Sequence, residues 1–149
     1  MRASRLILAI VVGVAVMATA TEHDVIAEPG FAVIVNAKSS VRALDKKTIA
    51  DAFLKKRTQW NDETAILPID QGRSASIRKQ FSEQVIGRSV AAVRTYWNRL
   101  VFSGRGVPPP EATSDDEVVR YVGKHAGAIG YVSGSTNLKD AGVKIIEVR

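Results

Sequence analysis

Apolar residues recur along this chain with two different spacings, which predict strands alternating with helices. Residues 31–36 form an apolar, largely β-branched run, which is typical of a buried strand. Residues 45–55 follow the helical spacing, with Ile49, Ala52 and Phe53 on one face and Asp45 in the N-cap position. We therefore expect the domain to begin with a strand followed by a helix.

The stretch from residue 65 to residue 81 has the pattern of a short strand, a turn and the start of a helix. Residues 65–69 are mostly apolar and too few for a typical helix, and residues 70–72 have the composition of a turn. Ile77, Phe81 and Val85 then recur every four positions, which places them on one helix face. Ser74 and Ser76 precede this face, where an N-cap is expected.

A third helix is predicted after Ser89, which stands in its N-cap position. The residues expected in its buried stripe are Val90, Val93, Trp97, Leu100 and Val101. The proline-rich residues 103–110 end this helix and predict an extended surface crossing.

The last third of the chain predicts one helix and two strands. Ser114 and Glu117 have the spacing of a capping box, which starts a helix that ends near Lys124. Strands are predicted at residues 127–132 and 143–148. The glycines of the first strand usually mark close approach of the backbone, and Val143 and Ile145, with Ile146 as a third candidate, are expected to be buried in the second. This alternation predicts an α/β domain with a mixed, mostly parallel sheet flanked by helices.

The first twenty residues have the pattern of a signal peptide and not of the fold. Arg2 and Arg5 form a basic start, residues 6–17 are apolar, and residues 18–20 are a small-x-small cleavage site. An uncleaved membrane anchor is the alternative, although the apolar run is shorter than the ~20 residues of a spanning helix. We expect export to the periplasm, cleavage after residue 20, a single domain at residues 21–149, and no membrane contact after cleavage.

Charge and composition narrow the function classes. Of 21 basic residues, Arg2 and Arg5 belong to the signal peptide, which leaves 19 against 15 acidic residues and a net charge of +4. A mildly basic protein suits anionic ligands, whereas a nucleic-acid partner would call for a dense basic tract. The chain has no cysteine, which excludes disulfides and a thiol nucleophile. It also lacks metal-ligand spacing, so we expect a protein without cofactor or catalysis.

The candidate site lies at the start of the second predicted helix. Helix N-termini expose unpaired N–H groups and the positive end of the helix dipole, and both attract anions. Hydroxyl and guanidinium groups add further donors at this position. The predicted ligand-binding residues are Gly72, Arg73, Ser74, Ala75, Ser76 and Arg78. The alternative is ordinary serine capping beside solvent-exposed arginines.

Several stretches, in order along nearly all of the mature chain, resemble the substrate-binding component of phosphate ABC transporters. They are VIVN at residues 33–36, FLKKRTQW at 53–60, ILPI at 66–69, YWNRLVFSGRG at 96–106 and GAIGYVS at 127–133. The resemblance implies a three-layer lobe of the type 2 periplasmic-binding-protein fold. It also implies phosphate or a similar small oxyanion as ligand, and a transporter or another envelope protein as partner.

The chain departs from that family at the anion-binding turn. The family places an Arg four residues before Ser-Gly-Thr, but aligning Ser74 with that Ser puts Asp70 where the Arg belongs. Shifting by one residue puts Ala75 at the Ser and Gln71 at the Arg, so neither register has the full pattern. The chain is also long enough for only one of the family's two lobes. Weak anion binding is therefore expected.

The same departures leave a second function open. A lobe that has lost its ligand would serve as an interaction module, docking on another envelope protein or on its own copy through the face near Arg94, Arg99 and residues 103–110.

Overall fold

A computed structural model describes residues 30–149. The predicted signal peptide, residues 1–20, and residues 21–29 lie outside this part of the chain, so export and cleavage stay predictions. Among the described residues, no helix has both the length and the apolar character that crossing a bilayer requires.

The centre of the domain is a four-stranded sheet with the order β3-β6-β1-β7. Its strands are β1 (Phe31–Asn36), β3 (Leu67–Pro68), β6 (Ala128–Ser133) and β7 (Val143–Ile145). β1 is antiparallel to both β6 and β7, whereas β3 is parallel to β6. Two short parallel pairs complete the pattern, β2 (Ala43–Leu44) with β8 (Glu147–Val148) and β4 (Asp70–Gln71) with β5 (Glu111–Ala112). The sheet structure is therefore mixed, with parallel pairs in the majority, as predicted.

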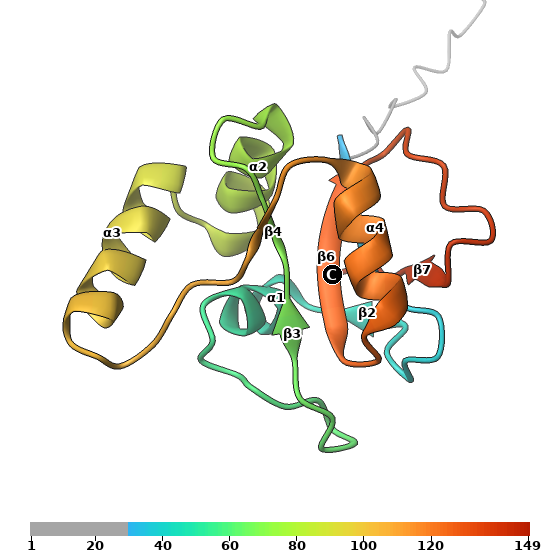
Figure 1. Ribbon diagram of the computed structural model, residues 1–149, viewed down its shortest axis with the longest axis horizontal. Helices are drawn as coiled ribbons and strands as arrows, with labels where there is room; N and C mark the ends of the chain where they lie inside the picture. The colour runs from blue at the N-terminus through green and yellow to red at the C-terminus, as the bar shows by residue number, and fades with distance from the viewer. Residues whose placement is uncertain (1–29) are drawn as a thin grey trace, which may run out of the picture.

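Helices cover both faces of the sheet and form the outer two of three layers (Figure 1). α4 (Asp115–Lys124) packs on one face through Val118 and Val122, both fully buried. α1 (Lys46–Phe53), α2 (Ser76–Phe81) and its π-helical continuation η1 (Ser82–Ile86) pack on the other face. The core on that side is aromatic: the rings of Phe81 and Tyr131 stack at 3.8 Å between centroids. The predicted α/β class is confirmed.

The glycines of β6 and the residue before it allow close approach of other segments. A Cβ on Gly130 would lie 2.6 Å from Val118 Cγ1, which would push α4 off the sheet. A Cβ on Gly127 would overlap the Ala65 carbonyl oxygen. The Gly127 carbonyl also accepts a 3.0 Å hydrogen bond from Trp60 Nε1, which fixes the indole at the edge of the core.

The predicted caps of three helices are confirmed, because Asp45, Ser89 and Ser114 each accept a backbone N–H of the helix that follows. The capping box differs in one detail. Glu117 accepts the Thr113 amide at 2.7 Å instead of reaching back to the amide of Ser114.

Two burial predictions were wrong. In α3 (Val90–Phe102) only Val93 and Trp97 are buried, and Val101 is exposed, because this helix packs on Leu54 at the side of the domain and not on the sheet. Ile145 is also exposed, because the predicted last strand divides into β7 and β8 and Ile146 between them points into the core.

Candidate functional site

The predicted anion site is the turn that links β4 to α2. β4 ends at Gln71 and α2 begins at Ser76, so residues 72–75 form the connection. Asp70 and Gln71 were predicted as part of the turn but form the strand β4, because they pair with β5 some forty residues later. The site therefore lies at the carboxyl end of a strand and at a helix N-terminus, where α/β folds commonly place ligands.

Arg78, in the first turn of α2, points inward and is almost fully buried. Its Nη2 lies 2.9 Å from Asp70 Oδ2, and its Nη1 lies 2.9 Å from Glu111 Oε1. Nη1 also donates to the Gln71 carbonyl oxygen at 2.7 Å. Through these contacts the buried guanidinium connects β4 to β5, and the carboxylates of Asp70 and Glu111 balance its charge.

Asp70 is the buried carboxylate of the ion-pair triad that it forms with Arg78 and Glu111. Its Oδ1 accepts the Tyr131 hydroxyl and, at 2.9 Å, the Gln71 amide. Burial raises the pKa of the Asp70 carboxyl above its ordinary value, although the Arg78 charge and these hydrogen bonds oppose the shift. Burial together with the Asp70 charge raises the pKa of the Tyr131 hydroxyl as well.

Glu111 joins the buried Asp70–Arg78 pair to the surface. Its Oε1 also accepts Arg73 Nε at 3.2 Å, and the Arg73 side chain is 66% exposed. Partial burial opposes ionisation of Glu111, but the hydrogen bonds and charges of Arg78 and Arg73 outweigh it and lower the pKa of this carboxyl. Glu111 therefore partly neutralises the one arginine of the predicted site that faces water.

The remaining predicted residues leave several donors open to solvent. Ser74 and Ser76 are exposed, and their hydroxyls have no hydrogen-bond partner among residues 30–149. The amides of Ser74, Ser76 and Ile77 likewise have no acceptor within that range, whereas the Ala75 amide donates to the Gly72 carbonyl at 3.0 Å. The prediction that a serine caps this helix was wrong, because the N-cap is Ala75, which makes no side-chain cap.

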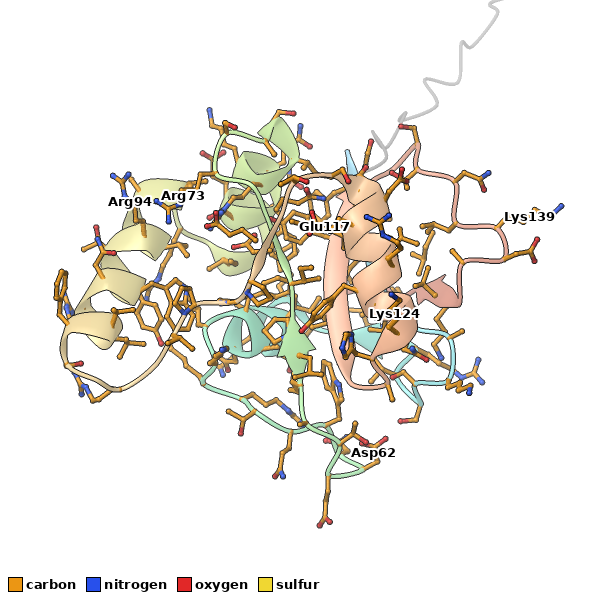
Figure 2. All side chains as sticks on the ribbon, in the orientation of Figure 1. Asp62, Arg73, Arg94, Glu117, Lys124 and Lys139 are labelled. Carbon is orange, nitrogen blue, oxygen red and sulfur yellow. The ribbon has the colours of Figure 1, made fainter. Side chains whose placement is uncertain are left out.

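Cationic groups frame the turn on the side of α3. A hollow of about 380 Å³ beside the serines is lined by Arg73, Lys79 and Glu83, so its charged lining is net positive. A smaller cavity of about 70 Å³ is lined by Arg73, Arg78 and Arg94 together with the carboxylates of Asp70 and Glu111. The side chains of Arg73 and Arg94 lie side by side (Figure 2). The sequence predicted Arg94 only as part of a docking face, and the packing of α3 reveals that it lines a cavity together with Arg73. Within residues 30–149, no group of His, Cys, Asp or Glu side chains is placed to hold a metal ion.

This arrangement of a strand end, a helix N-terminus and a turn can be compared with known proteins. A model of the PBP superfamily domain matches residues 13–147. The chain belongs to this family. No curated protein matches it significantly.

Several solved structures are similar to this PBP domain. A protein of Clostridium perfringens, assigned as a phosphate ABC transporter substrate-binding protein and solved with bound phosphate, is 20% identical with a TM-score of 0.63. An ABC-type phosphate transport receptor of Vibrio cholerae is also 20% identical, with a TM-score of 0.60. PstS of Borrelia burgdorferi is 13% identical, with a TM-score of 0.57. The alignments cover 80% of this PBP domain's chain but only 44%, 46% and 47% of those chains, so it spans less than half their length. At these identities the likeness shows a shared fold.

Sequence reasoning missed the residues that hold the turn of this PBP domain in place. Glu111 is 33 positions from Arg78, and no local pattern links the two. Gln71 Nε2 donates to Asp115 Oδ1 at 2.7 Å, and Asp115 Oδ2 also accepts the Ser133 amide at 3.0 Å. One signal was present in the sequence: Asp70, a charged residue directly after the apolar residues 65–69, could have predicted a buried counter-ion.

Proposed function

We propose that the protein is an exported, non-catalytic binding protein that holds phosphate or a similar small oxyanion weakly at residues 72–76. The observation that carries the proposal is the set of open donors at this turn. The amides of Ser74, Ser76 and Ile77 and the two serine hydroxyls have no internal acceptor among the described residues, and they lie beside Arg73. Donors grouped in this way at a helix start suit an anion.

Arg78, although predicted as a ligand-binding residue, has a different role in this proposal. Its guanidinium already contacts Asp70, Glu111 and the Gln71 carbonyl, so it shapes the turn and leaves direct contact with the anion to Arg73. Because the open donors face water and Glu111 competes for Arg73, each contact with an anion is weakened by hydration and screening. A Kd on the order of 1 mM, or about −4 kcal/mol, is the affinity we expect.

The family supports phosphate as the first ligand to test. The Clostridium perfringens protein was solved with bound phosphate, and the Vibrio cholerae protein is a phosphate transport receptor. Association with a transporter, location in the periplasm and cleavage of residues 1–20 belong to the same proposal. These three statements rest on the signal-peptide pattern and on the likeness to those receptors. They are part of the proposal because this chain spans less than half the length of those receptors.

A phosphate titration followed by amide chemical shifts tests the proposal. We expect saturable shifts at residues 72–77 in the millimolar range, with sulfate competing. Ser74→Ala/Ser76→Ala and Arg73→Gln should each weaken the response several-fold, because each removes donors from the turn. The matched controls Ser40→Ala and Arg42→Gln, whose side chains line a different hollow that contains no residue of the turn, should not. Unchanged spectra at ~20 mM phosphate, far above the expected Kd, would contradict the proposal.

One observation favours a second candidate, an envelope interaction module that has lost ligand binding. Asp70 and Glu111 occupy the guanidinium of Arg78, as a bound anion would. If these two carboxylates take the place of a bound anion, Asp70→Asn/Glu111→Gln should create phosphate-dependent shifts that the wild-type protein lacks. Under the first candidate, the wild-type protein already shows these shifts.

A further inference from the structure

α3 and the segment that follows it project from one end of the domain. We call residues 87–110 the α3 arm; it lies at one end of the long axis of the molecule (Figure 1). The arm is firmly attached, because Val93 and Trp97 are buried against Leu54 and the Tyr96 hydroxyl donates to the Leu54 carbonyl at 2.9 Å. Its outer surface is therefore a fixed part of the fold.

The far end of the arm presents apolar side chains to water. Phe102 is 90% exposed, Val107 65% and Val101 47%. Phe102 comes nine positions after the buried Val93, and at about 100° per residue it points to the opposite side of the helix. Phe102 and Val101 are consecutive at the end of α3, and Val107 follows five residues later in the same arm. A group of exposed apolar side chains marks a contact surface, whereas single ones are ordinary.

The charge of the arm has one sign. Residues 87–110 contain four arginines and no aspartate or glutamate. These are Arg88, Arg94, Arg99 and Arg105, all exposed. None of them forms an ion pair with another residue in the range 30–149. The apolar tip is thus accompanied by cations whose charges the rest of the described domain leaves unmatched.

We propose that the α3 arm binds the surface of an anionic phospholipid bilayer. Phe102, Val101 and Val107 enter the interface between headgroups and acyl chains, and Arg99 and Arg105 contact lipid phosphates. Charge complementarity supports this partner, and so does the small apolar area. The three side chains expose a few hundred Å², roughly, whereas a stable protein interface takes about 800 Å² from each partner. Binding to a lipid surface, by contrast, requires only a few projecting apolar side chains with cationic groups around them.

This inference goes beyond the proposed function, because Phe102, Val107, Arg99 and Arg105 line neither of the hollows beside the turn at residues 72–76. Val101 alone among the proposed contact residues shares a cavity with Arg73. It also differs from the sequence-based expectation of no membrane contact after cleavage. Contact with a lipid surface needs no spanning helix, so it agrees with the absence of one among the described residues.

Co-sedimentation of the purified protein with vesicles tests the inference. We expect binding to vesicles of equimolar phosphatidylglycerol and phosphatidylcholine, at least tenfold weaker binding to pure phosphatidylcholine, and loss of binding as NaCl rises from ~50 to ~300 mM. Phe102→Ser should reduce binding about tenfold at an unchanged melting temperature, because this side chain makes almost no contact within the fold.

Matched variants separate the arm from general charge effects. Arg99→Gln/Arg105→Gln should reduce binding about tenfold. Lys124→Gln/Lys139→Gln removes the same charge on the side away from α3 and should change it less than twofold (Figure 2). Ser74→Ala/Ser76→Ala should bind vesicles like the wild type, so failure of phosphate binding and failure of this inference are distinguishable. Absence of sedimentation with anionic vesicles, or equal loss in both charge variants, would overturn the inference; absence would point to an acidic protein surface instead.

Discussion

Replacing Arg78 by methionine tests whether the ion-pair triad of Arg78, Asp70 and Glu111 holds the turn in place. The substitution keeps most of the aliphatic stem but removes the guanidinium that contacts Asp70 Oδ2 and Glu111 Oε1, both at 2.9 Å. Asp70 would remain almost fully buried, with only the Tyr131 hydroxyl and the Gln71 amide as partners. Removing one partner of a buried ion pair costs about 3–5 kcal/mol, because the other charge is left uncompensated.

That loss is large compared with the stability of the domain. At about 0.05–0.15 kcal/mol per residue, the 120 residues from 30 to 149 have a free energy of unfolding of roughly 6–18 kcal/mol. Urea unfolding followed by tryptophan fluorescence should therefore show a markedly lower midpoint for Arg78→Met. The melting temperature should fall by about 10–20 °C.

Two further variants make the result interpretable. Asp70→Asn/Arg78→Met removes the charge that the single variant leaves unpaired, so it should recover at least about 1.5 kcal/mol of the loss. Arg73→Met removes an arginine that is paired with the same Glu111 but exposed, and should cost less than about 0.5 kcal/mol. Equal losses for Arg78→Met and Arg73→Met, or no recovery in the double variant, would refute the reasoning.

The loss of unfolding free energy in Arg78→Met should depend on pH, and the structure predicts the sign of this dependence. Burial raises the pKa of Asp70, and Arg78 is the strongest opposing influence, so Arg78→Met should raise the pKa further. The folded variant then binds a proton at a pH at which the unfolded chain, with an aspartate pKa of about 3.9, has released it. The deficit relative to wild type should shrink as pH falls through the raised pKa. Urea unfolding between about pH 8 and pH 4.5 measures this, and a deficit that is constant or grows toward acid would contradict it.

Two other variants test the packing and the polar network around the sheet. Gly127→Ala should destabilise the domain by about 3 kcal/mol or more in urea unfolding, because its Cβ would overlap the Ala65 carbonyl oxygen; Gly106→Ala, with no atom closer than 3.8 Å, should be near neutral. Asp115→Ala should cost about 2–3 kcal/mol and speed amide exchange in the loop after β6, because Asp115 accepts three hydrogen bonds that tie this loop and Gln71 to α4. The same change at the exposed Asp116 should do neither.

Elements whose stability is local could be predicted from the sequence. β1 is a continuous apolar run, and α1 and α4 combine a helical apolar stripe with a polar N-cap side chain, so pattern and cap agree. The glycines at and before β6 were also read correctly as points of close approach. In each of these places, the deciding contacts lie within a few residues or follow from the spacing itself.

The parts of the structure that the sequence did not predict depend on contacts between residues that are distant in the sequence. Asp70 and Gln71 have the composition of a turn, and they form a strand only because β5 lies beside them. Val101 fits a helical stripe but is exposed, because α3 meets Leu54 instead of the sheet. Apolar spacing predicts which face of a helix is buried only if the surface opposite that face is known.

The candidate site illustrates a third limit, since the sequence identified its donors but not the task of each. Arg73 and Arg78 have equal weight in a sequence pattern, yet Arg73 faces water and Arg78 is enclosed. The enclosed arginine explains why a turn without a side-chain cap can keep its shape: Ala75 makes no cap, so the first turn of α2 is held to β4 and β5 by Arg78 instead. Because the buried Arg78 side chain stabilises the turn, the serine hydroxyls and the amides at the start of α2 are not needed for that purpose. These hydroxyls and amides remain free to bind water or an anion. The ion-pair triad therefore has two effects: it makes Arg78 unavailable to a ligand, and it leaves the other donors of the site open.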